Sequence, residues 1–450
     1  MDELTNSVRV PIDPSIPILV RGANQVRAGR FVDPISATGW ESVFVVVALV
    51  ISTTAFVTLL PGDYFAIEDA AHGESVAQFI WVLIYLILLA SVWKSRRQLL
   101  LLCLRDKGLA VMTGWACASI LWSGMPAVTA RHSVALIGTL MFGGYLALRF
   151  PSRELLRLIL WAFGITIVGS IFVCFLFPNY GIFVDELTGE TAWRGVFSGK
   201  NELGRIIVFG IMTLATVSPK VQLFRFLPVV VVGLCVVLMT RAMTSLVYLP
   251  VALLLVFLIR RYQFHEGSRK KLVFFTAVLV ILSGSFLYNR WDSFTESLGK
   301  DPNLTGRTIL WVLSVPHIAE RPILGYGLDS FWYDPTGPAK ELRDASGWRE
   351  APNAHNAIIN LWIDIGFVGV LLFFWSYIGS LRNAFRLLQE NRSPEARWYV
   401  AFLVLLFLYG LTEISFLIRN EIFWILYIWT AVAVRRPRDH VVVSSTVRGI

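Results

Sequence analysis

The side chains best suited to chemistry are basic residues that stand at the ends of long apolar segments or on the stretches between them. The set comprises Arg194, Lys200, Arg205, Arg241, Arg307 and His355. Guanidinium groups bind phosphate through two parallel hydrogen bonds and stay charged at physiological pH. Several arginines that converge near a membrane surface would therefore suit a diphosphate. For any single one of them, contact with lipid phosphates is the commoner role.

His355 precedes Asn356 at the start of one apolar segment, and Asp364, Gly366 and Gly369 follow within it. An unperturbed histidine titrates at about pH 6.5, so at neutral pH it can take a proton from a hydroxyl group. A single histidine at a helix start more often makes structural hydrogen bonds than performs catalysis. The residue types alone leave both roles open.

Other chemistries find no matching pattern. The stretch from Gly195 to Asn201 resembles a phosphate-binding loop, but it has three residues between its glycines instead of four, and Asn201 stands where a magnesium-binding Ser or Thr belongs. The four cysteines lie in apolar stretches without C-x-x-C spacing, and the six histidines do not cluster. We therefore expect no nucleotide, metal or other cofactor and no disulfide framework.

Composition indicates the elements that must position these residues. The chain has 450 residues, of which 56% are hydrophobic and 16% charged, with a mean hydropathy of +0.63. Soluble domains are about 45–50% apolar and about 25% charged. The composition excludes a cytosolic globular enzyme, a disordered chain and a nucleic-acid-binding module, and it predicts a polytopic, all-α membrane protein.

Hydropathy divides the chain into about twelve candidate membrane spans, since a spanning helix needs about 20 apolar residues. The spans are predicted at 41–60, 76–93, 108–123, 133–148, 155–177, 203–218, 227–240, 245–259, 272–288, 356–380, 399–414 and 420–434. They form two groups, 40–288 and 356–434, separated by a long loop at 289–355. Residues 1–39 and 435–450 are expected to be tails outside the membrane.

The net charge of +9 is explained by topology. If both termini are cytoplasmic, the tails and cytoplasmic loops hold 27 of the 40 basic residues, the loop 289–355 holds seven, and six remain for the other outer positions. Short loops rich in Lys and Arg stay in the cytoplasm, whereas long loops are exempt from this rule. We therefore expect cytoplasmic tails and place the loops 178–202 and 289–355 on the outer, periplasmic side.

The two outer loops are too long to be simple connectors, because loops beyond about 15 residues are usually functional or disordered. Their aromatic residues argue against disorder, and they include Trp193, Trp311, Phe331, Trp332, Tyr333 and Trp348. Gly306–Glu320 has the pattern of an amphipathic helix.

Three sequence blocks resemble those of the O-antigen ligase and polysaccharide polymerase superfamily. His355-Asn356 with Gly366 and Gly369 matches its H-N-x9-G-x-x-G pattern, and Thr305-Gly306-Arg307, Trp311 and Pro322-Ile-Leu-Gly325-Tyr-Gly327 resemble the stretch that precedes it. Trp193-Arg-Gly-Val-Phe197 with Lys200-Asn201-Glu-Leu-Gly204 is similar to a block of the ExoQ-like exopolysaccharide polymerases. The blocks follow family order over roughly 190–370.

The resemblance implies an all-helical membrane fold related to the GT-C glycosyltransferases, active at the periplasmic face of the bacterial inner membrane. The implied donor is a glycan on undecaprenyl diphosphate, which is transferred to a sugar hydroxyl without a nucleotide sugar or a metal. The family's functional arginines correspond to Arg241 and Arg307, and its histidine corresponds to His355. A flippase and a chain-length regulator are expected as partners from the family's pathway.

These features favour a Wzy-type exopolysaccharide polymerase. Arg241 and Arg307 would bind the diphosphate, and His355 would orient or deprotonate the acceptor hydroxyl. Further substrate contacts are expected from Arg194, Lys200, Asn201, Arg205, Asn356, Trp332 and Tyr333. The aromatic loop 326–348 would stack on sugar rings.

Two alternatives stay open. A ligase that attaches a finished glycan to lipid A core or protein would share the donor chemistry, although the block around Arg194 favours the polymerase. A transporter of lipid-linked glycans would carry ionisable residues at mid-membrane. The candidates for that role are Asp364 and, nearer span ends, Arg205, Glu413 and Arg419. Because most spans lack such residues, this class is less favoured.

Overall fold

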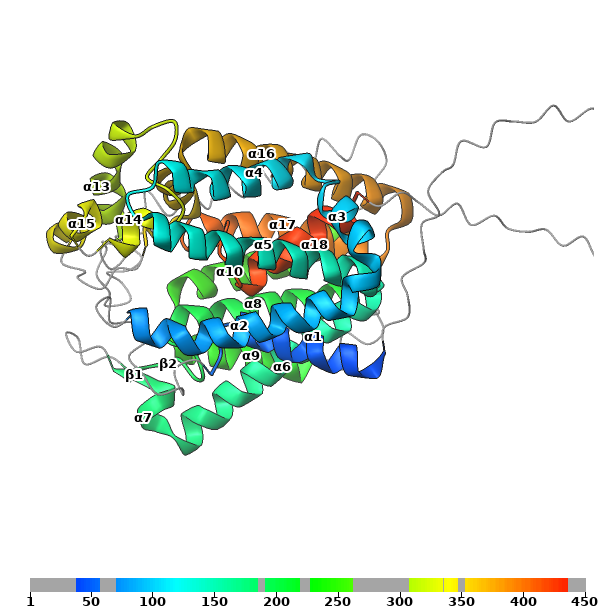
Figure 1. Ribbon diagram of the computed structural model, residues 1–450. Coiled ribbons are helices and arrows are strands. Elements are labelled where there is room, and N and C mark those ends of the chain that lie inside the picture. The colour runs from blue at the N-terminus through cyan, green and yellow to red at the C-terminus, as the bar shows by residue number, and fades with distance from the viewer. Residues whose placement is uncertain are drawn as a thin grey trace, which may run out of the picture.

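The computed structural model describes residues 38–56, 70–184, 191–218, 227–261, 307–334, 336–346 and 353–435. These residues form a bundle of helices that run roughly parallel or antiparallel to one another (Figure 1). The long helices are α1 (Gly39–Ser52), α2 (Ala70–Val92), α4 (Lys107–Ala118), α5 (Pro126–Arg149), α6 (Ser152–Leu176), α8 (Lys200–Val217), α9 (Leu227–Thr240), α10 (Met243–Arg261), α16 (Ala357–Asn391), α17 (Pro394–Gly410) and α18 (Ile422–Ala433).

Shorter elements join or cover these helices. They are η2 (Trp93–Ser95), α3 (Arg96–Cys103), η3 (Ser119–Leu121), α7 (Pro178–Gly181), β1 (Ile182–Val184), β2 (Thr191–Trp193), α13 (Arg307–Glu320), α14 (Ser330–Tyr333) and α15 (Pro338–Ser346). β1 and β2 pair antiparallel, with Ile182 opposite Trp193, and add a small sheet to the predicted all-helical fold. α13 coincides with the predicted amphipathic helix.

Every predicted span except 272–288, which lies outside the described residues, overlaps a helix. Four helices are long and apolar enough to cross a membrane by length and composition: Val76–Cys103, which joins α2, η2 and α3, then Ser152–Leu176, Met243–Arg261 and Ala357–Asn391. Gly39–Ser52, Lys107–Leu121, Leu227–Thr240 and Ile422–Ala433 are apolar but shorter. The prediction of a mostly helical membrane protein is confirmed, whereas the number of spans stays a prediction.

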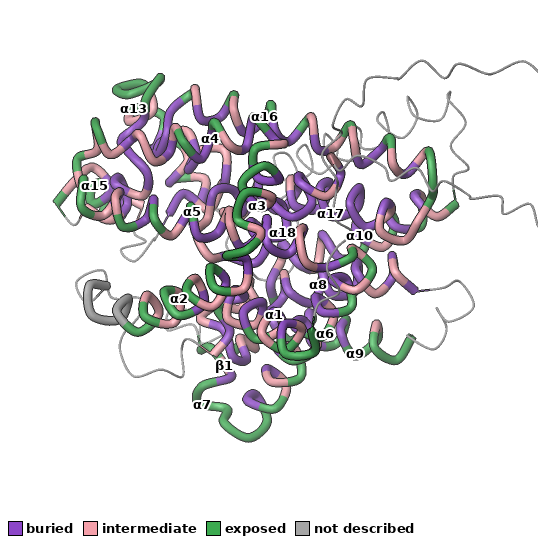
Figure 2. The backbone as a smooth tube through the Cα atoms, turned by 45° about the vertical axis from the view of Figure 1, so that its right-hand side comes forward, coloured by how far each residue is buried: buried purple, intermediate pink, exposed green. Residues whose placement is uncertain are grey.

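Apolar side chains fill the centre of the bundle and also cover its outside. Figure 2 shows buried residues concentrated in α8, α17 and α18, whereas α2, α3 and α7 are largely exposed. Trp398, Trp424 and Trp429 are fully buried. Trp161 and Phe175 on α6, by contrast, are 67% and 70% exposed. Helices that are apolar on every side are typical of a lipid environment, where outward-facing apolar side chains meet acyl chains.

A break in α16 attaches the outer segments to the bundle. Gly366 has a φ of +70°, and the helix is non-helical at this point. The carbonyl groups of Ile363 and Asp364 accept hydrogen bonds from the amides of Tyr326 and Gly327, both at 2.8 Å. A Cβ on Gly366 would collide with the backbone of Ile323. The glycine therefore permits both the break and the close approach of the segment after α13.

Gly366→Ala is expected to destabilise the attachment of α13–α15. A left-handed backbone costs a non-glycine residue about 1–2 kcal/mol, and the collision with backbone adds to that cost. Thermal unfolding of the purified protein should show a clear drop in midpoint. Gly164→Ala on α6, where a Cβ would meet nothing within 4 Å, is the matched control and should unfold like the parent. Equal midpoints for both variants would contradict this role of Gly366.

The two ends of the bundle differ. α13, α14 and α15 lie at one end (Figure 1). At the other end, Arg149 at the close of α5 pairs with Glu41 in the first turn of α1 at 2.7 Å. There Arg435, after α18, also pairs with Asp106 at 2.8 Å. The described chain thus starts and finishes at the end opposite α13–α15 (Figure 1).

Candidate functional site

Polar contacts concentrate between α17 and α18, in residues 411–421, which we call the 411–421 loop. Its Glu413 accepts a hydrogen bond from Nη2 of Arg307 at 2.8 Å and lies 3.1 Å from Nδ1 of His355. Their side chains are only 13%, 6% and 15% exposed, in that order. These three residues form the central cluster, which brings together segments far apart in the sequence.

Local structure holds each member of the central cluster in place. Arg307 is the first residue of α13 and also donates through Nη1 to the backbone of the 411–421 loop. His355 has a left-handed backbone, with φ of +46°, immediately before α16. Asn356 caps that helix by accepting from two amides of its first turn, and its Nδ2 donates to the carbonyl of Leu411 at 3.1 Å. Asn356 therefore fixes His355 against the loop.

The charges of the central cluster are well defined. Burial opposes ionisation of Glu413, but the Arg307 guanidinium and the hydrogen bond with His355 outweigh it and lower the pKa of Glu413 to about 2. Burial and then the charge of Arg307 lower the pKa of His355, against the opposing effect of Glu413. At neutral pH the imidazole is therefore uncharged. Because the carboxylate accepts from Nδ1, we assign the lone pair to Nε2, which is the atom that could accept a proton.

The lowered pKa of His355 predicts how activity depends on pH. A reaction that needs the neutral imidazole should keep its rate as pH falls through 6.5, the ordinary histidine value, and decline only below it. The stability contributed by Glu413 is present above its ordinary pKa of 4.5 and is lost as pH falls from there toward about 2. Rate and unfolding measured against pH should therefore show activity declining before the protein unfolds. An acid limb at or above 6.5 would contradict this prediction.

Arg205 also holds the 411–421 loop in place. From α8 it donates to Glu421 at 2.9 Å and to the carbonyl of Ile414 at 3.1 Å. Its guanidinium also lies 4.3 Å from the ring centroid of Phe423. These contacts give Arg205, which we predicted to bind substrate, a role in holding the loop that carries Glu413.

Arg241, Lys200 and Asn201 lie near this end of the bundle. Arg241 is exposed in the turn between α9 and α10, with φ of +49°. Lys200 and Asn201 open α8 and are half-buried. α8 and α10 pack closely here, since a Cβ on Gly204 would lie 3.2 Å from that of Ala242. Arg205, in the first turns of α8, contacts the 411–421 loop. Arg241, Lys200 and Asn201 therefore lie at the end of the bundle that carries this loop.

Two other predicted binding residues have structural contacts. Arg194 donates through Nε to the carbonyl of Tyr180 at 2.8 Å and so joins the end of β2 to α7. Trp332 is 4% exposed and packs in the core beneath α13–α15 with Phe331 and Leu342. Trp332, which we predicted to bind substrate, thus has a role in packing. Small outer layers need their own apolar core, and aromatic residues supply it.

Tyr333 belongs to a second group, the outer polar cluster of His132, Asp329, Tyr333 and Arg419. Asp329 lies 2.7 Å from Nη1 of Arg419 and 2.8 Å from Nδ1 of His132. Nη2 of Arg419 donates to the Tyr333 hydroxyl at 2.7 Å. Burial raises the pKa of Asp329, but Arg419 and His132 outweigh it and lower the value to about 2. The cluster ties the 411–421 loop to α14 and α5.

The sequence prediction did not assign roles at the site to Glu413, Glu421, Asp329 and His132. One available signal was that Glu413, Arg419 and Glu421 lie within a short loop between two buried apolar helices. A charge in such surroundings needs a partner, because leaving it unpaired is costly. The partners themselves come from distant parts of the sequence and are visible only in the structure.

Comparisons with known proteins agree with the sequence blocks. Residues 228–374 match the family model described as O-antigen ligase. The chain is 25% identical over 357 residues to the exopolysaccharide production protein ExoQ of Rhizobium meliloti strain 1021, covering 72% of this chain and 76% of that protein. It is 29% identical over 147 residues to a Rickettsia conorii protein provisionally named a polysaccharide ligase, covering 30% of this chain and 34% of that protein.

Proposed function

We propose that this protein is a membrane glycosyltransferase that polymerises lipid-linked glycans. The premise is that the chain belongs to the O-antigen ligase superfamily through its residues 228–374. Its donor would be a glycan on undecaprenyl diphosphate and its acceptor a sugar hydroxyl of another lipid-linked repeat unit. The observation that carries the proposal is the central cluster, in which a neutral histidine is oriented by a carboxylate that an arginine holds ionised. The match to ExoQ over 72% of the chain favours exopolysaccharide synthesis.

In this reaction the acceptor hydroxyl gives its proton to Nε2 of His355 as its oxygen attacks the anomeric carbon of the donor. The new glycosidic bond forms while the bond to the diphosphate breaks, and the electron pair leaves with undecaprenyl diphosphate. Glu413 stabilises the imidazolium that results, and His355 later releases the proton to solvent. Attack from the face opposite the leaving group inverts the anomeric centre.

The cations near the central cluster would bind the diphosphate. Arg241 is exposed and Lys200 half-buried, so both can reach a lipid headgroup. Nη1 and Nη2 of Arg307 hold the loop and Glu413, while its buried Nε has no hydrogen-bond partner in the described part of the chain. Arg307 would thus contribute positive potential and one donor as charge develops on the leaving group. Arg194, Asn201 and Tyr333 stay as outlying substrate contacts in this proposal.

The same proposal sets the orientation of the protein. The end that carries α13–α15 and the central cluster would face the periplasm from the bacterial inner membrane, and the end that carries Arg149 and Arg435 would face the cytoplasm. Arg and Lys in short loops favour this direction. Two partner proteins would act with this enzyme in the membrane: a flippase that delivers the donor and a regulator of chain length.

A ligase is the second candidate, supported by the family description of residues 228–374 and by the Rickettsia relative. Donor chemistry is shared, so the acceptor decides between them. Gel analysis of glycans from a strain that lacks this protein separates the two. A missing polymerase leaves single repeat units on the carrier, as we expect. Long carrier-linked chains in that strain would show a ligase and contradict the polymerase.

A further inference from the structure

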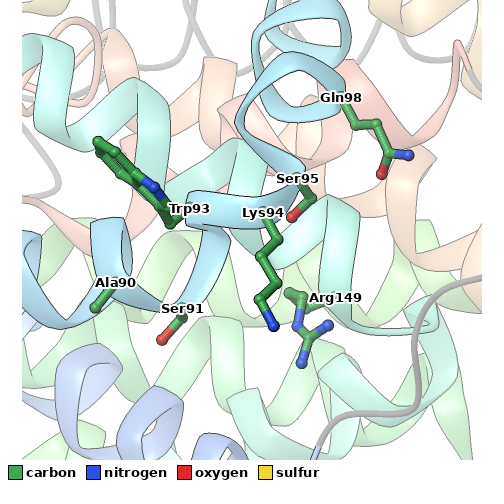
Figure 3. A pocket seen from close by; sticks show the side chains of 7 residues that line it. All are labelled: Ala90, Ser91, Trp93, Lys94, Ser95, Gln98 and Arg149. Carbon is green, nitrogen blue, oxygen red and sulfur yellow. The ribbon is translucent and has the colours of Figure 1, made fainter.

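A cavity of 790 Å³ lies at the end of the bundle opposite the central cluster, where α2 continues through η2 into α3. It is lined by Ala90, Ser91, Trp93, Lys94, Ser95, Gln98 and Arg149. Figure 3 shows the Lys94 side chain reaching toward the Arg149 guanidinium. Nothing in the proposed glycosyl transfer uses this cavity.

The cavity carries a net positive charge. Arg149 is held in place by Glu41, which accepts from Nε at 2.9 Å and from Nη2 at 2.7 Å. That carboxylate balances only one of the two cations, because Lys94 lines the same cavity. Two positive charges directed into one cavity favour the binding of an anion between them. The Arg149 guanidinium is already fixed by a carboxylate, so it loses little conformational entropy when it binds the anion. Hydroxyl and amide groups of the lining can donate to the same anion.

The apolar surface beside the cavity indicates where that anion comes from. Leu86, Leu89 and Trp93 are 57%, 39% and 62% exposed. Leu86 and Leu89 share one face of α2 by their spacing, and Trp93, which lines the cavity, follows at the start of η2. α2 has 23 residues and ends at Val92, directly before Trp93. At 1.5 Å per residue this is about 34 Å, against about 30 Å for the hydrocarbon core of a bilayer. Its Trp93 end thus suits the headgroup level, where tryptophan is enriched.

We propose that this cavity binds the headgroup of an anionic phospholipid. The phosphate lies between Lys94 and Arg149, the polar lining receives the headgroup hydroxyls, and an acyl chain follows the face of Leu86 and Leu89. Basic pockets between membrane helices bind such headgroups through the same combination of charge and apolar contact. The site is independent of the proposed glycosyl transfer.

The test measures how tightly the full-length, detergent-solubilised protein binds phosphatidylglycerol, with phosphatidylcholine of the same chain length as reference, by native mass spectrometry. Lys94→Gln should weaken phosphatidylglycerol binding about fivefold. Arg97→Gln is the matched control, since this exposed residue, three positions along, makes the same charge change outside the cavity. Ala90→Phe, which fills the cavity without changing charge, should also weaken binding.

Equal binding by the parent, Lys94→Gln and Ala90→Phe would overturn the proposal, and so would equal losses in Lys94→Gln and Arg97→Gln, which would indicate general surface attraction. Soluble glycerol phosphate distinguishes the source of the phosphate. It should not displace the lipid at matched concentration, because it lacks the acyl chain. Displacement at that concentration would assign the cavity to a soluble phosphate and overturn the lipid.

Discussion

His355→Ala is expected to abolish polymer formation in cells and to slow transfer by the purified protein at least about 10²-fold, the usual contribution of a general base. The imidazole is neutral, nearly buried and oriented by Glu413, so its loss removes the group that takes the acceptor proton. The variant should still insert, because the Asn356 cap and the contacts of Arg307 do not need the ring. Polymer length on gels and the rate with a carrier-linked repeat unit measure the effect.

His317→Ala is the matched control for that variant. His317 lies in α13, packs edge-on against Phe331 at 5.5 Å and lies 3.5 Å from Glu320, in the same outer layer but outside the central cluster. It should keep most of its activity. If His355→Ala gave polymer of normal length from normal amounts of protein, His355 would have no part in the chemistry.

Glu413→Gln has the second large expected effect. The change keeps the shape of the side chain but leaves Arg307 as a buried charge without its carboxylate, and breaking such a pair costs about 3–5 kcal/mol. It also removes the group that raises the pKa of His355. We expect a strong loss of activity, with the acid limb of any residual rate moved to lower pH. Thermal unfolding and rate against pH measure the two effects separately.

Glu421→Gln makes the same change in the same loop at the residue that pairs with Arg205. It should loosen the 411–421 loop but leave the acid limb of the rate where the parent has it. Should Glu413→Gln and Glu421→Gln behave alike in stability and in pH dependence, Glu413 would be a structural residue only, and its assignment to His355 would be wrong.

The helices could be predicted from the sequence because an apolar run of sufficient length has few other stable forms in a membrane. The approximate positions of these helices follow from hydropathy. The position of α13 follows from its amphipathic pattern. The sequence showed Gly366 as part of the G-x-x-G motif but did not predict the helix break there. Its cause is the backbone of residues 322–327, which docks there. Contacts of this range are set by the fold and leave no local signal.

The candidate site was predicted in part. His355 and Arg307 do lie together, as expected from their position at element ends, but the carboxylate that joins them comes from another loop. An aromatic residue in an outer loop has the same sequence signal whether it faces a sugar or fills a core, and Trp332 is buried in the structure. An arginine near a span end likewise has the same sequence signal whether it binds a substrate or an acid of the protein, and Arg205 pairs with Glu421 in the structure.

The most direct test of the central claim is a reaction of the purified protein, in detergent or bilayer, with a repeat unit on undecaprenyl diphosphate and no nucleotide or added metal. We predict longer carrier-linked glycans and released undecaprenyl diphosphate, with the parent but not with His355→Ala. Movement of the intact donor across a sealed bilayer, with no new glycosidic bond, would contradict a glycosyltransferase and assign the protein to transport.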